Sequence, residues 1–163
     1  MNKILKIIII GSTIPFSACG LGSAEVGVSS STVSHSIVDE SGCIAAVKAG
    51  SQYTTTACSA VYNIEFTAEE TGGDCDAENV KVNYKFTSNG SNKVAIVFGN
   101  IAAGSHKKIT KDITVPNIYQ LENIGFDNLK FDANCGGVIT GIKGSPLEIE
   151  PIDETSLLIK DSD

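Results

Sequence analysis

Apolar and polar residues alternate with a period of two along most of the chain after residue 43. The clearest run is residues 80–86, where Val, Val, Tyr and Phe alternate with Lys, Asn and Lys. Similar runs cover residues 60–67, 94–98 and 109–115. Such alternation places every second side chain on one face of an extended strand. We therefore predict a β-strand in each of these four segments.

The alternation changes phase once, between Ile124 and Phe126 on one side and Leu129 and Phe131 on the other. A shift by one residue inside a strand is what a β-bulge produces. Shorter strands are predicted at the end of the chain. Their ranges are 138–142, 147–149 and 156–159.

Glycine and asparagine separate these runs. Gly50-Ser51 suits a two-residue hairpin, Asn89-Gly90 suits a type I′ turn, and Gly144-Ser145-Pro146 ends the strand before it. The sequon Asn89-Gly-Ser91 is interpreted as this turn and not as a glycosylation site. No segment shows a helical period. About seven strands, each with one wet face, predict an all-β antiparallel sandwich. Its core is expected to contain the aromatic residues Tyr62, Phe66, Tyr84, Phe86, Phe98 and Phe126.

The segment from Val61 to Ile113 resembles a known class of domain. It has alternating strands, the turn after Phe86, and Gly104 shortly before the next strand. In this it is similar to the small immunoglobulin-like or fibronectin-III-like sandwiches of exported bacterial proteins, including FxLYD-type domains, although the FxLYD signature itself is absent. The resemblance implies a binding or scaffold module.

The first eighteen residues have the composition of an export signal. Lys3 and Lys6 form a short basic start, an apolar run follows, and small residues precede Cys19. The Ser17-Ala18-Cys19 junction resembles the lipobox of bacterial lipoproteins, with Phe16 where leucine is favoured. The resemblance implies lipidation of Cys19 and, because the next residue is not aspartate, sorting to the outer membrane. Secretion after cleavage near Ala18 is the alternative; an uncleaved anchor is disfavoured, because a spanning helix needs about twenty apolar residues.

These signals divide the chain into three parts. Residues 1–18 are the predicted signal peptide, and residues 19–42 are a lipidated N-terminus with a Gly- and Ser-rich tether. Residues 43–163 are the predicted sandwich domain. A coil of the tether's length would reach roughly 25–30 Å. An alternative is that Val33 or Ile37 belongs to an added edge strand.

The charge of the chain excludes some partners. Cleavage would remove Lys3 and Lys6 from 12 basic residues, so 10 lysines would face 19 Asp and Glu, and the net charge would fall from −7 to −9. The chain contains no arginine. An acidic chain without arginine is a poor ligand for nucleic acid or anionic lipid headgroups. A membrane is therefore expected to hold this protein only through Cys19.

Four cysteines remain for disulfides: Cys43, Cys58, Cys75 and Cys135. Their spacing lacks the close pairs of zinc sites, and an even number in an exported protein indicates two bridges. A hairpin at Gly50-Ser51 would place Cys43 opposite Cys58, although on a hydrogen-bonded pair. Another arrangement of strands brings Cys43, Cys75 and Cys135 to one end. We favour Cys43–Cys58 with Cys75–Cys135.

Few residues suggest chemistry. His35 and His106 have no partners nearby in sequence, and no Gly-x-Ser-x-Gly nucleophile motif occurs. We predict neither catalysis nor a cofactor. A weak candidate for a calcium site is the acidic loop containing Asp74, Asp76 and Glu78, whose spacing does not fit an EF-hand.

The sequence therefore predicts an exported, lipid-anchored, protein-binding sandwich of the bacterial envelope that acts in adhesion, host interaction or envelope assembly. It would face the periplasm or the cell surface. The alternatives are a structural or accessory lipoprotein of an envelope complex, and a lipoprotein that binds calcium or a small ligand. The protein partner is not identified by any motif.

Overall fold

The computed structural model describes residues 22–86, 93–119, 122–136, 138–149 and 151, and every structural statement below concerns these residues. They form eight strands and one short helix. The elements are β1 (Ser23–Ile37), α1 (Glu40–Lys48), β2 (Ala60–Glu70), β3 (Ala77–Phe86), β4 (Lys93–Ile101), β5 (His106–Val115), β6 (Glu122–Ala133), β7 (Val138–Lys143) and β8 (Leu147–Ile149). Cys19, the Asn89-Gly90 turn and the predicted strand 156–159 lie outside the described residues.

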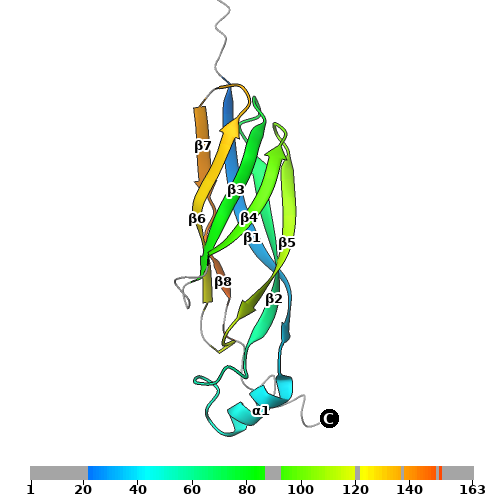
Figure 1. The fold of residues 1–163 in the computed structure, drawn as a ribbon, viewed down its shortest axis with the longest axis vertical. Helices are drawn as coiled ribbons and strands as arrows, with labels where there is room; N and C mark the ends of the chain where they lie inside the picture. Colours follow the sequence, from blue (N-terminus) through cyan, green and yellow to red (C-terminus); the bar gives the residue numbers. More distant parts are fainter. Residues whose placement is uncertain (1–21, 87–92, 120–121, 137, 150, 152–163) are drawn as a thin grey trace, which may run out of the picture.

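The strands form two four-stranded sheets that make an elongated sandwich (Figure 1). The first sheet has the order β5-β2-β1-β7, and the second has the order β4-β3-β6-β8. Buried side chains from both sheets form one core. The all-β sandwich is confirmed, with eight strands in the described residues instead of about seven. The β1–β7 pair is parallel, whereas the other pairs are antiparallel.

The prediction of a tether before residue 43 is wrong, because β1 is an interior strand. Its Ala24, Val26 and Val28 are buried, and they alternate with less buried residues. β1 pairs with β2 along most of its length and with β7 near its start. The domain therefore begins near Gly22. The alternative, in which Val33 or Ile37 belongs to an edge strand, is also wrong, because β1 lies between β2 and β7 and not at the edge of the sheet.

The predicted hairpin at Gly50-Ser51 is also wrong, because α1 occupies this region. The Asp39 side chain accepts a hydrogen bond from Gly42 N at 2.9 Å, which caps the start of the helix. Gly50 follows the last turn with a φ of +67°, a conformation that glycine adopts without strain. The Cys43–Cys58 bridge therefore joins α1 to the start of β2.

Both favoured disulfides are confirmed. Cys43–Cys58 lies at the α1 end of the sandwich, and Cys75–Cys135 lies at the other end, where it joins the β2–β3 loop to the chain after β6. At the α1 end, Asn117 Nδ2 donates to Gln52 O at 2.8 Å and so holds two loops together. Each end of the molecule is thus closed by a covalent bridge.

The last two strands act as one strand that changes sheet. β7 pairs with β1 in the first sheet, and β8 pairs with β6 in the second. Gly144 lies at the crossover, where its N donates to Val28 O at 2.9 Å and where an added Cβ would collide with the same oxygen. The predicted break at Gly144-Ser145-Pro146 is therefore a change of sheet and not a reversal of the chain.

Aromatic side chains fill the centre of the core. Tyr84 is fully buried, and its ring lies 4.1 Å from the ring of Phe66 and 4.9 Å from that of Phe126, measured between centroids. Tyr62 and Phe98 are also buried, as predicted, whereas Phe126 is only partly buried. The side chain of Phe86 lies outside the part of the chain that the structure describes. Burial raises the pKa of the Tyr84 hydroxyl, for which no described residue provides a hydrogen-bond partner.

Glu70 ends β2, and only 1% of it is exposed. Its Oε1 accepts hydrogen bonds from Glu25 N at 3.1 Å and Gly72 N at 2.8 Å. Its Oε2 accepts from Gly73 N at 3.0 Å and Gly104 N at 2.8 Å. The donors belong to β1, the β2–β3 loop and the β4–β5 turn. One carboxylate therefore joins three separate segments at the Cys75–Cys135 end.

Two opposing effects determine the pKa of the Glu70 carboxyl. Burial raises this pKa, whereas the four backbone hydrogen bonds lower it and prevail, so it lies below its usual value of 4.5. Gly72 has no room for a side chain beside the carboxylate, since an added Cβ would lie 2.7 Å from both Glu70 Oε1 and Ser23 O.

We predict that Glu70→Gln lowers the free energy of unfolding at pH 7 by about 2–3 kcal/mol. The amide would turn an NH₂ group toward backbone N–H donors that now meet a carboxylate oxygen. Urea denaturation measures the change. The matched control is Glu69→Gln at the exposed neighbouring position, where the effect should stay within about 0.5 kcal/mol.

The stability difference should also depend on pH. Because the folded-state pKa of Glu70 is depressed, its ionised form stabilises the fold fully above the unfolded-state pKa, which is the usual value of 4.5. This stabilisation is lost as the pH falls through the folded-state value. The gap between the wild type and Glu70→Gln should narrow below about pH 4. A gap that stays constant down to about pH 3 would contradict the role given to the charge.

We predict that Tyr84→Phe leaves the free energy of unfolding unchanged or raises it by about 1 kcal/mol, because it removes a buried hydroxyl without a partner. Tyr84→Leu should lower it by about 2 kcal/mol, since the ring contacts with Phe66 and Phe126 are lost. Thermal and urea denaturation of both variants test this. A clear loss of stability in Tyr84→Phe would show that the hydroxyl is hydrogen-bonded.

Candidate functional site

The β4–β5 side of the sandwich is protected against the addition of a further strand. Lys107, Lys108 and Lys111 are exposed on the edge strand β5. Lys107 Nζ also donates to Phe98 O in β4 at 3.2 Å. Lysines on an edge strand hinder its pairing with another chain. This side is therefore a poor place for a partner to dock.

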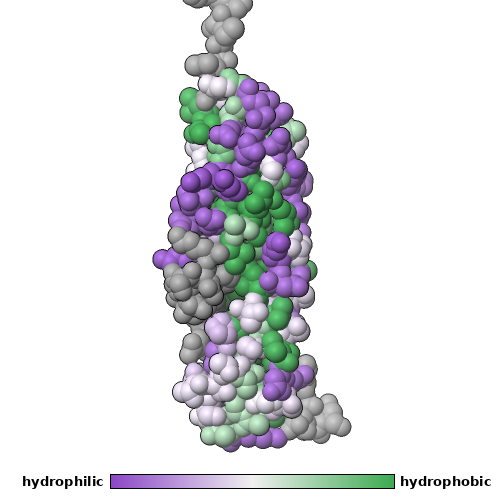
Figure 2. All heavy atoms as spheres, in the orientation of Figure 1, coloured by the Kyte–Doolittle hydropathy of each residue, from purple (hydrophilic) through white to green (hydrophobic). Residues whose placement is uncertain are grey.

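The opposite side of the sandwich is formed by β7 and has a different character. All six residues of β7 are exposed, and for Val138, Ile139 and Ile142 the exposed fractions are 65%, 51% and 47%. Figure 2 shows a small apolar patch at the upper end of this strand and a larger one over the middle of the sandwich, where Figure 1 places β3 and β4. Three large apolar side chains on one short edge strand are unusual unless something covers them.

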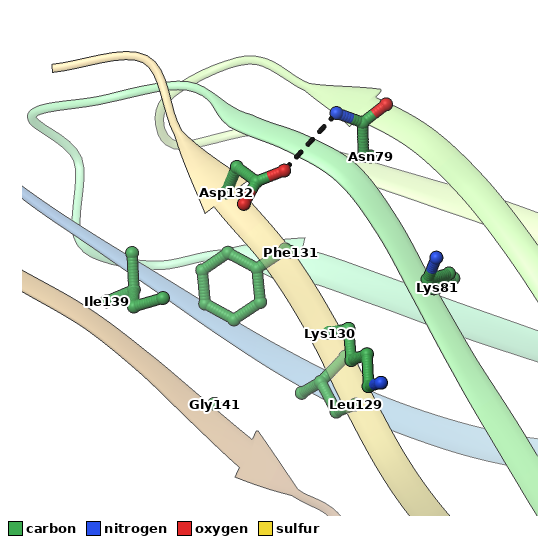
Figure 3. Close-up of a pocket in the computed structure, with 8 residues that line it drawn as sticks. All are labelled: Asn79, Lys81, Leu129, Lys130, Phe131, Asp132, Ile139 and Gly141. Carbon is green, nitrogen blue, oxygen red and sulfur yellow. Dashed lines mark hydrogen bonds between the residues drawn. The ribbon is translucent and has the colours of Figure 1, made fainter. Parts of the chain in front are cut away.

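A half-open groove of about 450 Å³ lies beside β7 (Figure 3). We call it the β6–β7 groove. It is lined by Asn79, Lys81, Leu129, Lys130, Phe131, Asp132, Ile139 and Gly141. Its volume falls in the range of about 300–1,000 Å³ that is usual for ligand sites. A smaller hollow of about 320 Å³ lies further along β6, near Phe126 and Pro146.

The groove exists because β6 lacks a neighbouring strand along much of one edge. β3 pairs with one edge of β6, but on the other edge β8 covers only Glu122–Ile124. β7 does not fill the remaining space, since it pairs with β1 in the other sheet. Pro146 lies beside Gly125–Asp127, but among the described elements no strand pairs with Asn128–Asp132 on this edge. The backbone of Asn128–Asp132 can therefore accept an added strand.

Two bulges turn β6 side chains toward the groove. Asn128 in β6 has a φ of 53°, and Asn79 in β3 has a φ of 55°. The pairing of the two strands shifts register near both residues. The bulge at Asn128 confirms the phase shift seen in the sequence. It lets Phe131 and Leu129 lie on the side of β6 that faces β7.

Apolar side chains form the wall of the groove between the two sheets. Figure 3 shows Phe131 and Leu129 on β6 directed toward Ile139 and Gly141 on β7. A Cβ added at Gly141 would lie 3.1 Å from Leu129 Cδ2 and 3.7 Å from Phe131 Cε1. The glycine thus leaves room for the β6 side chains to reach across the gap.

Two lysines face each other at the rim of the groove. Lys81 on β3 lies opposite Lys130 on β6 in the register of the second sheet, and both are exposed. Neither lysine makes an ion pair or a hydrogen bond with a described residue. Like charges directly opposite one another destabilise a sheet. Asp132 lies at the same rim, but its carboxylate accepts a hydrogen bond from Asn79 Nδ2 at 3.4 Å.

The structure does not assemble the acidic residues of the calcium candidate into a metal site. Asp76 Oδ1 accepts from Ala103 N at 3.0 Å, and its Oδ2 accepts from Asn134 Nδ2 at 3.2 Å. Asp74 is exposed in the loop, and Glu78 lies on β3. Within the described residues, no three His, Cys, Asp or Glu side chains are grouped so that they could hold a metal ion.

The two histidines lie far apart. His35 is on β1 and stacks on Tyr62, with 5.2 Å between ring centroids, whereas His106 opens β5 opposite Glu69. These two positions are seven residue steps apart along β2, from Tyr62 to Glu69, which corresponds to roughly 23 Å. They therefore cannot act on one substrate atom together.

Sequence reasoning missed the β6–β7 groove. Residues 138–142 were predicted to form a strand, but nothing indicated that it would lie at an edge. One signal was present: Val138 and Ile139 are adjacent and apolar, so at least one of them must leave the core in a strand. The opposition of Lys81 and Lys130 depends on the pairing register, which the sequence does not reveal.

Comparisons with known proteins give no name to this site. No protein-family model matches the chain, and no curated protein is similar to it. One solved structure, the X-ray structure of Northeast Structural Genomics Consortium target SoR45, is 10% identical. The match covers 78% of this chain and 85% of that one, with a TM-score of 0.46. A likeness at this level decides neither the fold nor the function.

Within the described part of the chain, no helix has the length and apolar character needed to cross a bilayer.

Proposed function

We propose that this protein is a protein-binding β-sandwich of the bacterial envelope, exported and held to the membrane by lipid on Cys19. The observation that carries the binding role is the difference between the two sides of the sandwich. Lysines protect the edge strand β5, although Val97 on the neighbouring β4 is 64% exposed, whereas three exposed apolar residues and the groove lie together on the β7 side. A surface of the second kind is typical of a site that another chain covers.

The position of β1 restricts how an anchored domain would stand. An added Cβ at Gly22 would lie 2.5 Å from Cys75 Sγ, so the chain enters the sandwich against the Cys75–Cys135 bridge. Cys19 precedes Gly22 by three residues, which span at most about 11 Å. A lipid on Cys19 would therefore hold this end of the domain at the membrane surface, with no long tether between them.

This geometry favours one of the envelope roles. β7 begins three residues after Cys135, so the groove lies in the half of the sandwich nearest the proposed anchor. α1 and the Cys43–Cys58 bridge would point away from the membrane (Figure 1). A partner that reaches the groove would then be close to the same membrane. We therefore favour envelope assembly over adhesion to a distant surface.

Site-specific photo-crosslinking in intact envelopes tests the binding role. A benzophenone amino acid placed at position 139 or 138 on β7 should give a crosslinked product with another envelope protein, because this edge is the proposed contact. The same probe at position 110, which is exposed on β5, is the control and should give none. Absence of product at both β7 positions would refute the binding role, as would equal product at position 110.

Mass spectrometry of the purified mature protein tests the anchor. The wild type should carry a mass increment corresponding to acyl chains on its N-terminal cysteine and should partition with membranes. Cys19→Ala should lack both properties, because the acceptor thiol is gone. A lipid-free mass in both proteins would refute lipidation but would leave the binding role open.

A further inference from the structure

We propose that the β6–β7 groove binds an extended polypeptide segment in which apolar and acidic side chains alternate, and that this segment adds as a strand to the free edge of β6. The inference rests on the proposed function and specifies the class of its partner. It is carried by three features of the groove: an unpaired backbone edge, an apolar wall and a pair of opposed lysines.

The first feature is the backbone of β6. β8 pairs antiparallel with Glu122–Ile124, and the chain just before β8 lies beside Gly125–Asp127, where Pro146 lines the smaller hollow. Beyond this point, a partner strand would meet the backbone of Asn128–Asp132, with which no described strand pairs on this edge. Main-chain hydrogen bonds supply affinity in this mode of recognition, and side-chain pockets supply specificity.

The chain itself shows which side chains suit this edge. In β8, Leu147 is partly buried and Ile149 is buried, whereas Glu148 between them is exposed. β8 is therefore a short strand of the pattern apolar, acidic, apolar. A partner that continues the line of β8 would meet a similar environment further along β6.

The second feature selects the inward-facing side chains. Leu129 and Phe131 are directed toward β7 and meet Ile139 there, with about half of the Ile139 side chain exposed. An apolar side chain inserted at this point would remove the exposed part of the wall from water. Burial of an apolar side chain favours binding roughly in proportion to the apolar area that it removes from water.

The third feature selects the outward-facing side chains. An added strand would place every second side chain on the outer face of the sheet, next to Lys130 and near Lys81. A carboxylate there would relieve the repulsion between the two lysines. This local pair of positive charges is complementary to an acidic segment, although the chain as a whole has a net charge of −7.

An amphiphile such as a fatty acid would also combine an apolar tail with a carboxylate. It would leave the N–H and C=O groups along β6 unused, whereas a polypeptide strand would satisfy them. The free edge of β6 therefore favours a polypeptide, and the amphiphile becomes an outcome of the test.

Fluorescence anisotropy with labelled seven-residue peptides tests the proposal on the mature Cys19→Ala chain. The acidic probe alternates Leu or Ile with Glu, and the matched basic probe has Lys in place of Glu. The acidic probe should bind with a dissociation constant below about 1 mM and the basic probe much more weakly. Two further acidic probes carry N-methyl groups on their backbone amides, one probe at the odd positions and the other at the even positions. Every second N–H of an added strand points toward its neighbour, so one of these two probes can no longer donate hydrogen bonds to β6 and should lose binding.

Substitutions identify the site. Lys130→Glu should weaken binding of the acidic peptide by about tenfold and strengthen binding of the basic one. Ile139→Ser should weaken both. Lys111→Glu makes the same change of charge on the β5 side and should alter affinity by less than about twofold. Circular dichroism spectra that match the wild type would show that the variants fold.

Several results would overturn the proposal. These are the absence of saturable binding by the acidic peptide, equal affinity for both peptides, or binding that Lys130→Glu leaves unchanged. If lauric acid bound to the groove and neither peptide did, the groove would be assigned to a lipid. The proposed function would survive these failures if crosslinking from position 138 still captured an envelope protein, since that residue points to the other side of β7 from Ile139.

Discussion

The buried carboxylate of Glu70 fixes the end of the sandwich on which the groove depends. It is the last residue of β2, and it accepts hydrogen bonds from β1, the β2–β3 loop and the β4–β5 turn. Three segments that are distant in sequence are thus joined by one ionised group. A carboxylate in this position is stable only because backbone N–H groups replace the water it has lost. If the charge were removed by protonation, one of the two oxygens would carry a hydrogen, and the buried N–H groups that face this oxygen would lose their acceptor.

This junction also determines where the walls of the groove lie. Glu25 donates its N–H to Glu70 and is paired in register with Thr140 of β7. At the same end, the Cys75–Cys135 bridge joins the loop after β2 to the residues after β6. The positions of β7 and of the end of β6 are therefore both set by contacts around Glu70 and this bridge. These contacts hold the two strands in place at this end of the groove.

The sequence predicted the parts of the fold that large apolar residues define. The strands containing Tyr62, Tyr84 and Phe98 were found from alternation, and the bulge in β6 was found from its change of phase. β1 was missed, because its buried side chains are as small as Ala24 and lie in a segment rich in Gly and Ser, which looks like a linker. α1 was missed because its apolar residues, Cys43–Val47, are consecutive and so show no helical period. The Cys43–Cys58 pairing was correct although the hairpin that suggested it does not exist: a short helix returns the chain as a hairpin would.

The groove could not be predicted, because it arises from a strand that serves two sheets. β7 pairs with one part of β1, and the chain then continues as β8, which pairs with one part of β6. In the described structure, the remaining part of the edge is therefore uncovered on both β1 and β6. On β1 this edge is Ser29–Ile37, which consists mainly of Ser, Thr and other polar residues that water can solvate. On β6 it is Asn128–Asp132, with Leu129 and Phe131 beside it and Lys130 at its rim. The crossover alone requires both edges to be open. The apolar wall and two lysines that make no ion pair with a described residue are present on only one of them, and this difference is our reason to propose the binding site on β6.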